Sequence, residues 1–132
     1  MVNKKSWTVG MMVPLAVATM VATAPAASAA KVIPTVASGP CSAGSLWTVK
    51  AKPDNSGMEI ELQIDSNVTG QTWNVRVTDN DELVTEDTKV TLAPSGSFTV
   101  RALTADRVGV DHIAGLARNP GTDETCIAQV NR

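Results

Sequence analysis

The feature that most constrains the fold is a strict alternation of apolar and polar side chains. From Met58 to Asp65 the sequence reads MEIELQID, so that every second residue is apolar. Successive side chains of a β-strand point to opposite faces of the sheet, and a half-buried strand therefore shows a period of two residues. This segment is predicted to be a strand with its apolar row in a core and its acidic row in water.

The same period recurs along most of the chain, and short runs of Pro, Gly, Asn and Asp separate the segments. The predicted strands are residues 46–52, 58–65, 71–79, 83–85, 89–92, 97–103, 111–118 and 125–130, of which 83–85 and 89–92 are the weakest. No helical periodicity competes with them. Seven or eight short strands with one apolar face each predict an all-β antiparallel β-sandwich. The large aromatic residues on those apolar faces, predicted to lie in the core, are Trp47, Trp73 and Phe98.

Matching the faces of neighbouring strands predicts the register of the first hairpin. If Ala51 lies opposite Met58, the apolar rows coincide and Lys50 meets Glu59 on the other face. Such an exposed ion pair contributes about 0.2–1 kcal/mol. We therefore interpret the acidic row as the solvated side of a sheet.

The last hairpin can be aligned in the same way. With Ala117 opposite Cys126, the surrounding face consists mainly of small residues, including Gly115. We expect the disulfide or the segment around the first cysteine to approach that face closely. Leu116 and Ile127 then meet on the opposite, exposed face. This apolar pair marks either a contact surface or the ordinary exposure of apolar residues that all proteins show.

The first 30 residues have the pattern of a secretory signal peptide. Lys4 and Lys5 precede an apolar run over residues 9–21, and small residues then lead to a predicted cleavage site after Ala29 or Ala30. A membrane anchor is the alternative, but it requires about 20 strongly apolar residues. We expect a secreted domain that has no membrane segment after cleavage.

The mature chain is predicted to have two parts. Residues 31–45 are rich in Pro, Gly, Ser and Ala and are predicted to form an extended leader without a strand, while residues 46–132 form the sandwich. Without Lys4 and Lys5, the 11 basic residues fall to 9 against 13 acidic ones. An acidic chain without a basic cluster does not suit nucleic acid or anionic lipid, which require patches of Lys and Arg.

Cys41 and Cys126 are the only cysteines, and they lie near opposite ends of the mature chain. In an oxidising compartment the simplest interpretation is one disulfide. Closing a loop of this length stabilises a fold by about 4–5 kcal/mol in the chain-entropy model. A redox or metal-binding pair would require close spacing such as C-x-x-C, which is absent.

Two segments carry a resemblance to known folds. Trp73 within TWNVRVTDN and the last hairpin, DHIAGLARNPGTDETCIAQV, resemble an immunoglobulin-like or fibronectin-III-like sandwich over about 85 residues. The absence of Tyr departs from that pattern, as does the placement of the cysteines. The whole chain also looks like small exported proteins of high-GC Gram-positive bacteria that have no assigned activity. These resemblances imply a fold and a location, but they do not imply a particular chemical reaction.

The residues that could carry catalysis are few. His112 is the only histidine, and its neighbour Asp111 should point to the opposite face of the strand, so the two cannot form a catalytic couple. Glu59 and Glu61 share a face at a separation of about 7 Å, but a glycosidase also needs a cleft and exposed aromatic residues. We expect no enzyme activity and no cofactor.

Calcium is the remaining candidate ligand. Asp79, Asp81 and Glu82 cluster at one predicted turn, and calcium prefers several oxygen ligands from a flexible loop. The spacing does not fit the EF-hand pattern, and Asp favours turns for backbone reasons, so a turn that holds no metal is the favoured interpretation.

The sequence therefore predicts a secreted, non-catalytic binding or structural module whose partner is an extracellular protein or a cell-wall component. The alternative is a secreted protease inhibitor that presents an exposed loop, for which residues 66–70 or 119–123 are candidates.

Overall fold

The computed structural model describes residues 33–132 together with residues 10, 14, 16, 18 and 20–25. The predicted signal peptide and its cleavage site fall largely outside the described residues. Residues 1–30 and 31–132 form separate units, and the second unit contains all eight strands found among the described residues. These strands are β1 (Thr35–Pro40), β2 (Leu46–Asp54), β3 (Gly57–Asp65), β4 (Thr72–Asp79), β5 (Glu82–Val90), β6 (Ser97–Ala105), β7 (His112–Asn119) and β8 (Glu124–Asn131).

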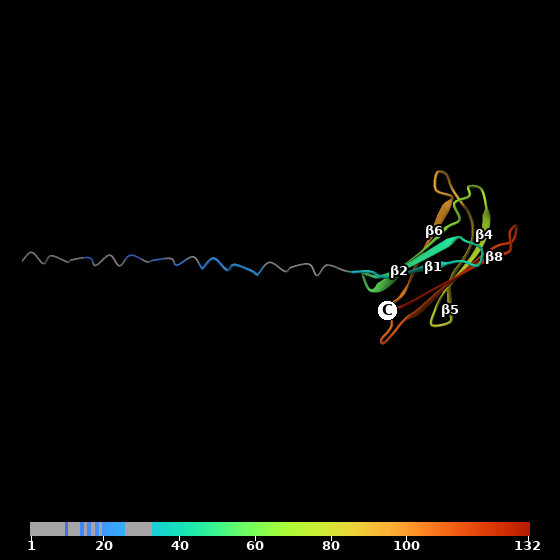
Figure 1. The fold of residues 1–132 in the computed structure, drawn as a ribbon. Helices are drawn as coiled ribbons and strands as arrows, with labels where there is room; N and C mark the ends of the chain where they lie inside the picture. The colour runs from blue at the N-terminus through green and yellow to red at the C-terminus, as the bar shows by residue number, and fades with distance from the viewer. Residues whose placement is uncertain (1–9, 11–13, 15, 17, 19, 26–32) are drawn as a thin grey trace, which may run out of the picture. The chain divides into compact units, whose positions relative to one another are not determined.

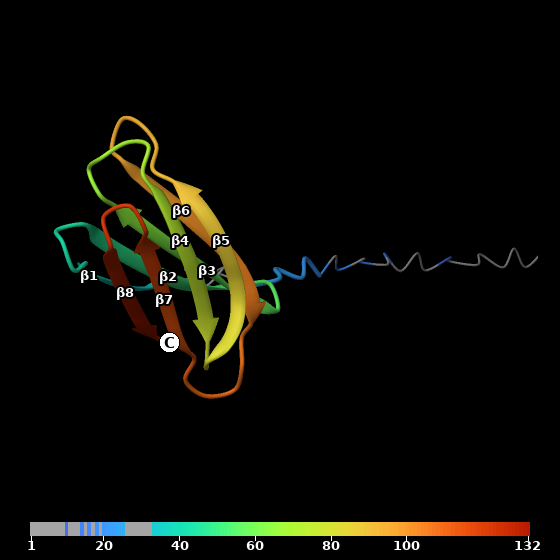
Figure 2. The ribbon, with the colours of Figure 1, turned by 90° about the vertical axis from the view of Figure 1, so that its right-hand side faces the viewer.

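The strands form two antiparallel sheets of four strands each. One sheet has the order β1-β2-β3-β6 and the other the order β5-β4-β7-β8. Figures 1 and 2 show the two sheets as facing layers, and in Figure 2 the second sheet lies in front. The predicted all-β antiparallel sandwich is confirmed.

The core lies between the two layers and consists of the side chains that point inward from both sheets. Trp73 is fully buried, and its ring centroid lies 6.3 Å from that of Phe98. Trp47 is only partly buried and packs against the edge of the core. The buried apolar residues are Val49, Ala51, Met58, Ile60, Leu62, Ile64, Trp73, Val75, Val77, Phe98, Val100, Ile113, Ala117, Cys126, Ala128 and Val130.

The register predicted for the hairpin of β2 and β3 is wrong by two residues. Ala51 lies opposite Ile60, because the turn is shorter than expected and the strands continue to residues 54 and 57. Asn55 occupies this turn with a φ of 51°, a left-handed conformation that Asn tolerates better than most residues. A shift of two residues keeps every side chain on its predicted face, so the alternation alone could not detect the error.

The prediction that the leader contains no strand is also wrong, because β1 pairs with β2. Gly39 lies opposite Trp47, and a Cβ atom at Gly39 would stand 2.8 Å from Cζ2 of that indole. The glycine therefore lets the ring lie directly on the strand. β1 is an edge strand, where Pro40 can be accommodated although it lacks an N–H group.

β5 is one continuous strand, whereas the sequence predicted two weaker segments at 83–85 and 89–92. Asp87 and Lys89 occupy positions opposite two buried residues of β4, so the inner row of β5 is charged where an apolar row was expected. Their side chains form an ion pair with an N–O distance of 3.1 Å. β5 lies at the edge of its sheet, which leaves these charges in contact with water.

The register predicted for the hairpin of β7 and β8 is confirmed, with Ala117 opposite Cys126. We expected the disulfide or the segment around Cys41 to approach the small residues of this face. At Gly115 the neighbour is instead a leucine of the other sheet. A Cβ atom there would lie 2.8 Å from Cδ2 of Leu62, which reaches across from β3 in the other sheet. Gly115 therefore leaves room for Leu62 and sets the local spacing between the layers.

We expect Gly115→Ala to lower the free energy of unfolding by about 1–3 kcal/mol, because an added methyl group overpacks the core against Leu62. Leu62→Ala alone should cost about 2–5 kcal/mol through the cavity that it leaves. In the double variant the methyl group enters that cavity, so the two costs should not add. Urea unfolding of the wild type and the three variants measures the coupling, and strict additivity would contradict the proposed contact.

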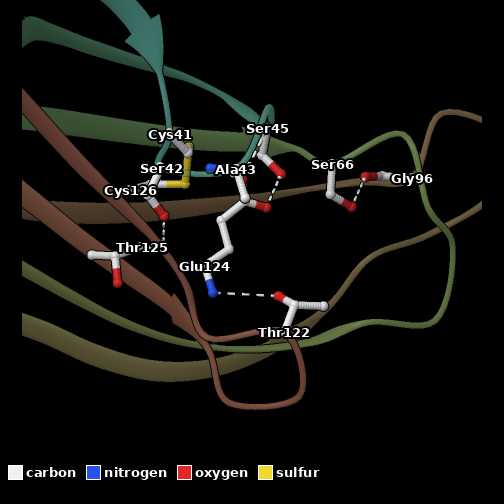
Figure 3. The surroundings of a disulfide bond; sticks show 10 residues. All are labelled: Cys41, Ser42, Ala43, Ser45, Ser66, Gly96, Thr122, Glu124, Thr125 and Cys126. Carbon is white, nitrogen blue, oxygen red and sulfur yellow. Dashed lines mark hydrogen bonds between the residues drawn. A yellow bond between two sulfur atoms is a disulfide. The ribbon is translucent and has the colours of Figure 1, made fainter.

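The predicted disulfide between Cys41 and Cys126 is confirmed, with an S–S distance of 2.00 Å and a sequence separation of 85 residues. It connects the segment after β1, in one sheet, to β8 in the other (Figure 3). The bond therefore joins the residue that directly follows the first strand to the last strand.

A buried carboxylate fixes the loop that follows Cys41. Glu124 is 7% exposed, and its carboxylate accepts hydrogen bonds from the amides of Ala43 (2.9 Å) and Ser45 (3.0 Å) and from the Ser45 hydroxyl (2.5 Å) (Figure 3). The amide of Ser42 also donates to the carbonyl of Thr125 at 2.9 Å. Together with the disulfide, these contacts fasten the loop between β1 and β2 to the start of β8.

The same contacts change the acidity of Glu124. Burial raises its pKa, but the hydrogen bonds from Ser45 and Ala43 favour the ionised form more strongly and hold the pKa below its usual value of 4.5. A depressed carboxyl pKa stabilises the folded state above the unfolded-state pKa. This contribution is lost as the pH falls below about 4.5 and through the lowered value.

Glu124→Gln should lower stability at pH 7 by about 1–3 kcal/mol, because the loop loses hydrogen bonds to a charged acceptor. It should also flatten the fall in stability on acidification below about pH 4.5. Thermal unfolding between pH 3 and pH 7 measures both effects. Glu86→Gln is the control, since the Glu86 side chain is 59% exposed, and an equal effect in the two variants would contradict this role for Glu124.

Candidate functional site

The outer face of the β1-β2-β3-β6 sheet carries a ladder of ion pairs. Lys52 pairs with Glu59 at 3.1 Å, while Glu61 lies between Lys50 at 3.8 Å and Arg101 at 3.1 Å. The expected partner of Lys50 was Glu59, and the change follows from the two-residue shift of the hairpin. Each of the two glutamates faces a cation, which fits the interpretation of the acidic row as a solvated surface.

The outer face of the second sheet is different, because two apolar side chains lie exposed side by side on β7 and the edge strand β8. Leu116 of β7 lies opposite Ile127 of β8, and these side chains are 45% and 59% exposed. In the same cross-strand row, Arg76 of β4 lies on the other side of Leu116, and Glu86 of β5 follows. Arg76 and Glu86 form an ion pair at 3.5 Å. The row therefore changes from charged to apolar across the four strands.

A groove of about 650 Å³ lies along this face. The residues that line it are Asn74, Val75, Arg76, Glu86, Asp87, Thr88, Leu116 and Arg118. Arg118 pairs with Asp123 at 2.5 Å, and the Thr88 hydroxyl donates to Oδ1 of Asn74 at 3.3 Å. We call Asn74, Arg76, Leu116, Arg118 and Ile127 the contact face.

The chemistry of the contact face suits recognition of another molecule. Two guanidinium groups and one amide offer hydrogen-bond donors beside the apolar pair. Protein interfaces commonly combine an apolar centre, a polar rim and enriched arginine. The sequence predicted the pairing of Leu116 with Ile127, but it did not identify Arg76 and Arg118 as their neighbours. Arg118 follows Leu116 by two residues on the same predicted strand, so their shared face was a signal that the sequence carried. Arg76 becomes a neighbour only once β4 is known to pair with β7.

Asp111 and His112 point to opposite sides, as strand geometry requires. Asp111 is buried, whereas His112 is exposed and its Nδ1 lies 2.8 Å from Oδ1 of Asn131. The backbone N–H of His112 donates to the Asn80 side chain at 2.9 Å. The histidine is thus held in a surface network on the outer side of the sheet.

The three calcium candidates do not share one environment. Asp79 is 1% exposed and points inward, while Asp81 and Glu82 are exposed. Glu82 forms an ion pair with Arg107. Instead, the structure brings Asp79 near Asp111, whose charge raises the pKa of Asp79. Among the described residues, no group of three or more His, Cys, Asp and Glu side chains has an arrangement suited to a metal ion.

In the part of the chain that the structure describes, no helix has the length and apolar character needed to cross a membrane. Comparison with protein-family models, with curated proteins and with solved structures finds no match to this chain. The interpretation of the candidate site therefore depends on the chemistry of its own residues.

The ion-pair ladder yields a prediction that separates a solvated surface from a catalytic one. Glu61→Gln should lower stability by no more than about 1 kcal/mol, and the difference should shrink in 1 M NaCl, because the pairs with Lys50 and Arg101 are exposed and screened. Urea unfolding at low and high salt measures this. A loss of several kcal/mol that salt does not change would contradict the interpretation.

Proposed function

We propose that residues 31–132 act outside the cell as a non-catalytic binding module, and that the contact face is the surface that meets its partner. The observation that carries this proposal is the exposed, directly paired side chains of Leu116 and Ile127 on the outer face of β7 and β8, beside two arginines. Grouped apolar side chains beside a groove and rimmed by arginines are typical of protein-recognition surfaces. The partner would be an extracellular protein or a cell-wall component.

Two observations support the extracellular location. The disulfide between Cys41 and Cys126 is of a kind that forms and persists in oxidising compartments. The first 30 residues have the charge, apolar run and small residues of a signal peptide.

The strand order supports an immunoglobulin-like relationship. In such sandwiches, strands A-B-E form part of one sheet and C′-C-F-G the other. The orders β2-β3-β6 and β5-β4-β7-β8 correspond to these, with β1 added beside β2. Trp73 lies in the core on the strand that corresponds to C. Two features differ from antibody domains: the disulfide joins the segment after β1 to the last strand, and the chain contains no Tyr.

The surroundings of the titratable side chains support a non-catalytic role. Glu59 and Glu61, the carboxylates that most resembled a catalytic pair, both face cations, and they line a small cavity of about 230 Å³ together with the paired lysines. His112 is engaged with Asn131. A general acid or base would need to meet a substrate within a water-excluding site. Both glutamates are instead occupied by ion pairs, and His112 is exposed.

The alternative of a protease inhibitor has less support from the candidate loops. In the loop over residues 66–70, the carbonyl of Val68 accepts hydrogen bonds from the hydroxyls of Thr91 (2.5 Å) and Ser66 (3.1 Å). A scissile carbonyl must instead accept from the oxyanion hole of the protease. The turn over 119–123 is folded on itself through Asn119, whose Oδ1 accepts from the amides of Gly121 and Thr122.

Binding should depend on the two apolar residues of the contact face. We expect the variant Leu116→Ser/Ile127→Ser to fold but to lose at least tenfold in affinity, because central apolar residues dominate the energy of most interfaces. The protein is immobilised and exposed to cell-envelope and culture-supernatant fractions, and the affinity of each captured molecule is then measured.

Leu103→Ser is the matched control, since Leu103 is 67% exposed on the outer face of the other sheet. The proposal requires this variant to bind like the wild type. Equal loss in both variants, or capture of no molecule by the wild type, would contradict the assignment. Stoichiometric inhibition of trypsin or subtilisin would favour the inhibitor instead.

A further inference from the structure

Two buried carboxylates lie together at the end of the sandwich that carries the turn between β4 and β5. Asp79 is the last residue of β4 and Asp111 directly precedes β7, and each is 1% exposed. Both continue inward-facing rows, since Asp79 follows Val77 in phase and Asp111 precedes Ile113 in phase. The fold thus brings two acids, 32 residues apart in sequence, to the inner side of the same sheet end.

Three of the four oxygens of these carboxylates have no hydrogen-bond partner in the protein. They are Oδ1 and Oδ2 of Asp79 and Oδ2 of Asp111. The fourth, Oδ1 of Asp111, accepts from the side-chain amide of Asn80 at 3.1 Å. A buried carboxylate without a partner is strongly unfavourable, and two carboxylates that repel each other are more so. Either a bound cation or a bound proton would remove this cost, and the neighbouring side chains that the structure describes supply no direct cationic partner.

The cationic side chains at this end of the molecule are engaged elsewhere. Arg107 pairs with Glu82 and lowers the pKa of Asp79 only through its charge. Arg132 directs its guanidinium to the carbonyl of Ala51 at 3.1 Å, although its backbone pairs with that of Asp111. His112 is bound to a side chain on the outer face.

The balance of these neighbours appears in the acidity of Asp79. Burial raises its pKa first, and the charge of Asp111 raises it further, while Arg107 and the hydroxyl of Thr104 oppose the shift and Glu82 adds to it. The groups that lower the pKa do not outweigh those that raise it, so the ionised form of Asp79 is disfavoured at this position.

We propose that Asp79 and Asp111 together bind a divalent cation, with Ca²⁺ as the ion whose chemistry fits. The free donors are carboxylate oxygens, with the Thr104 hydroxyl beside them, and calcium prefers oxygen ligands and tolerates irregular geometry. Because only two acidic side chains contribute, backbone carbonyls and water complete the coordination. Such a sparse set of charges corresponds to the weak affinities of extracellular calcium modules, with dissociation constants of about 10⁻⁴–10⁻³ M.

This site differs from the one that the sequence indicated. Asp81 and Glu82 lie in the same turn, but both are exposed and Glu82 is paired with Arg107. The bound ion would instead connect the end of β4 to the start of β7. It would also remove the repulsion between the two buried carboxylates.

The test compares thermal unfolding of the protein at pH 7 in 10 mM CaCl₂ and in EGTA. We expect calcium to raise the Tm of the wild type by about 5–10 °C, because a ligand that binds only the folded state stabilises it. Asp79→Asn and Asp111→Asn should each abolish this shift. Asp81→Asn and Glu82→Gln are matched controls from the same turn, and both should retain it. Isothermal titration with CaCl₂ should detect one site in the wild type and none in Asp79→Asn.

A second measurement shows whether a bound cation or a bound proton neutralises the two buried carboxylates. In EGTA, Asp79→Asn should have a higher Tm than the wild type, because the variant carries no unpartnered charge at this position. Without calcium, the wild type should lose stability as the pH rises from below 3.8 through the raised pKa of Asp79. If acidification stabilises the wild type while calcium has no effect at pH 7, a proton shared by the two carboxyls relieves the repulsion, and the cation proposal is overturned. Loss of the calcium shift in the Asp81 and Glu82 variants alone would also overturn it.

Discussion

The packing of one sheet's inner row onto the other is the interaction on which the rest of the structure depends. Leu62 of β3 occupies the space that Gly115 leaves open on β7, and this contact shows how closely the layers approach. Each strand contributes alternate side chains to that layer, so a slip of one residue would turn an entire apolar row toward water. The outward rows are then free to differ, and they do: one sheet presents a ladder of ion pairs and the other presents the contact face.

The sequence predicted those parts of the fold that local periodicity determines. Alternation identified the strand class and the faces, and matching those faces across the last turn predicted the correct register of the last hairpin. β1 was missed because its inner row contains Gly39 where an apolar residue was expected. β5 was predicted as two separate segments because its inner row contains Asp87 and Lys89. The first hairpin was misaligned because a shift by two residues preserves every face. Alternation also does not reveal the tight turn in which Asn55 has a left-handed conformation.

The candidate site was less predictable for a related reason. Leu116 and Ile127 could be paired from sequence because they belong to one hairpin. Arg76 joins them only through the pairing of β4 with β7, which connects segments far apart in the chain. The same pairing brings Asp79 near Asp111. Local patterns therefore show which residues face outward or inward, while the neighbours of each residue depend on strand order.

Two buried acids give the ends of the sandwich opposite responses to pH. At one end Glu124 has a lowered pKa because hydrogen bonds stabilise its charge, so acid weakens the attachment of the loop after Cys41. At the other end Asp79 has a raised pKa because burial and Asp111 oppose its charge, so acid relieves that end. The two pKa values shift in opposite directions because the hydrogen-bond donors and charges around the two carboxylates differ. Burial does not explain the difference, since both carboxylates are largely removed from water.

The charged inner row of β5 has a consequence for the behaviour of many copies of this protein in a crowded solution. An edge strand exposes unpaired backbone groups, to which the edge of another sheet can add and begin growth into fibrils. A copy docking beside β5 would have to dehydrate the charges of Asp87 and Lys89, which is unfavourable. The irregularity that concealed this strand in the sequence thus also protects the protein against aggregation.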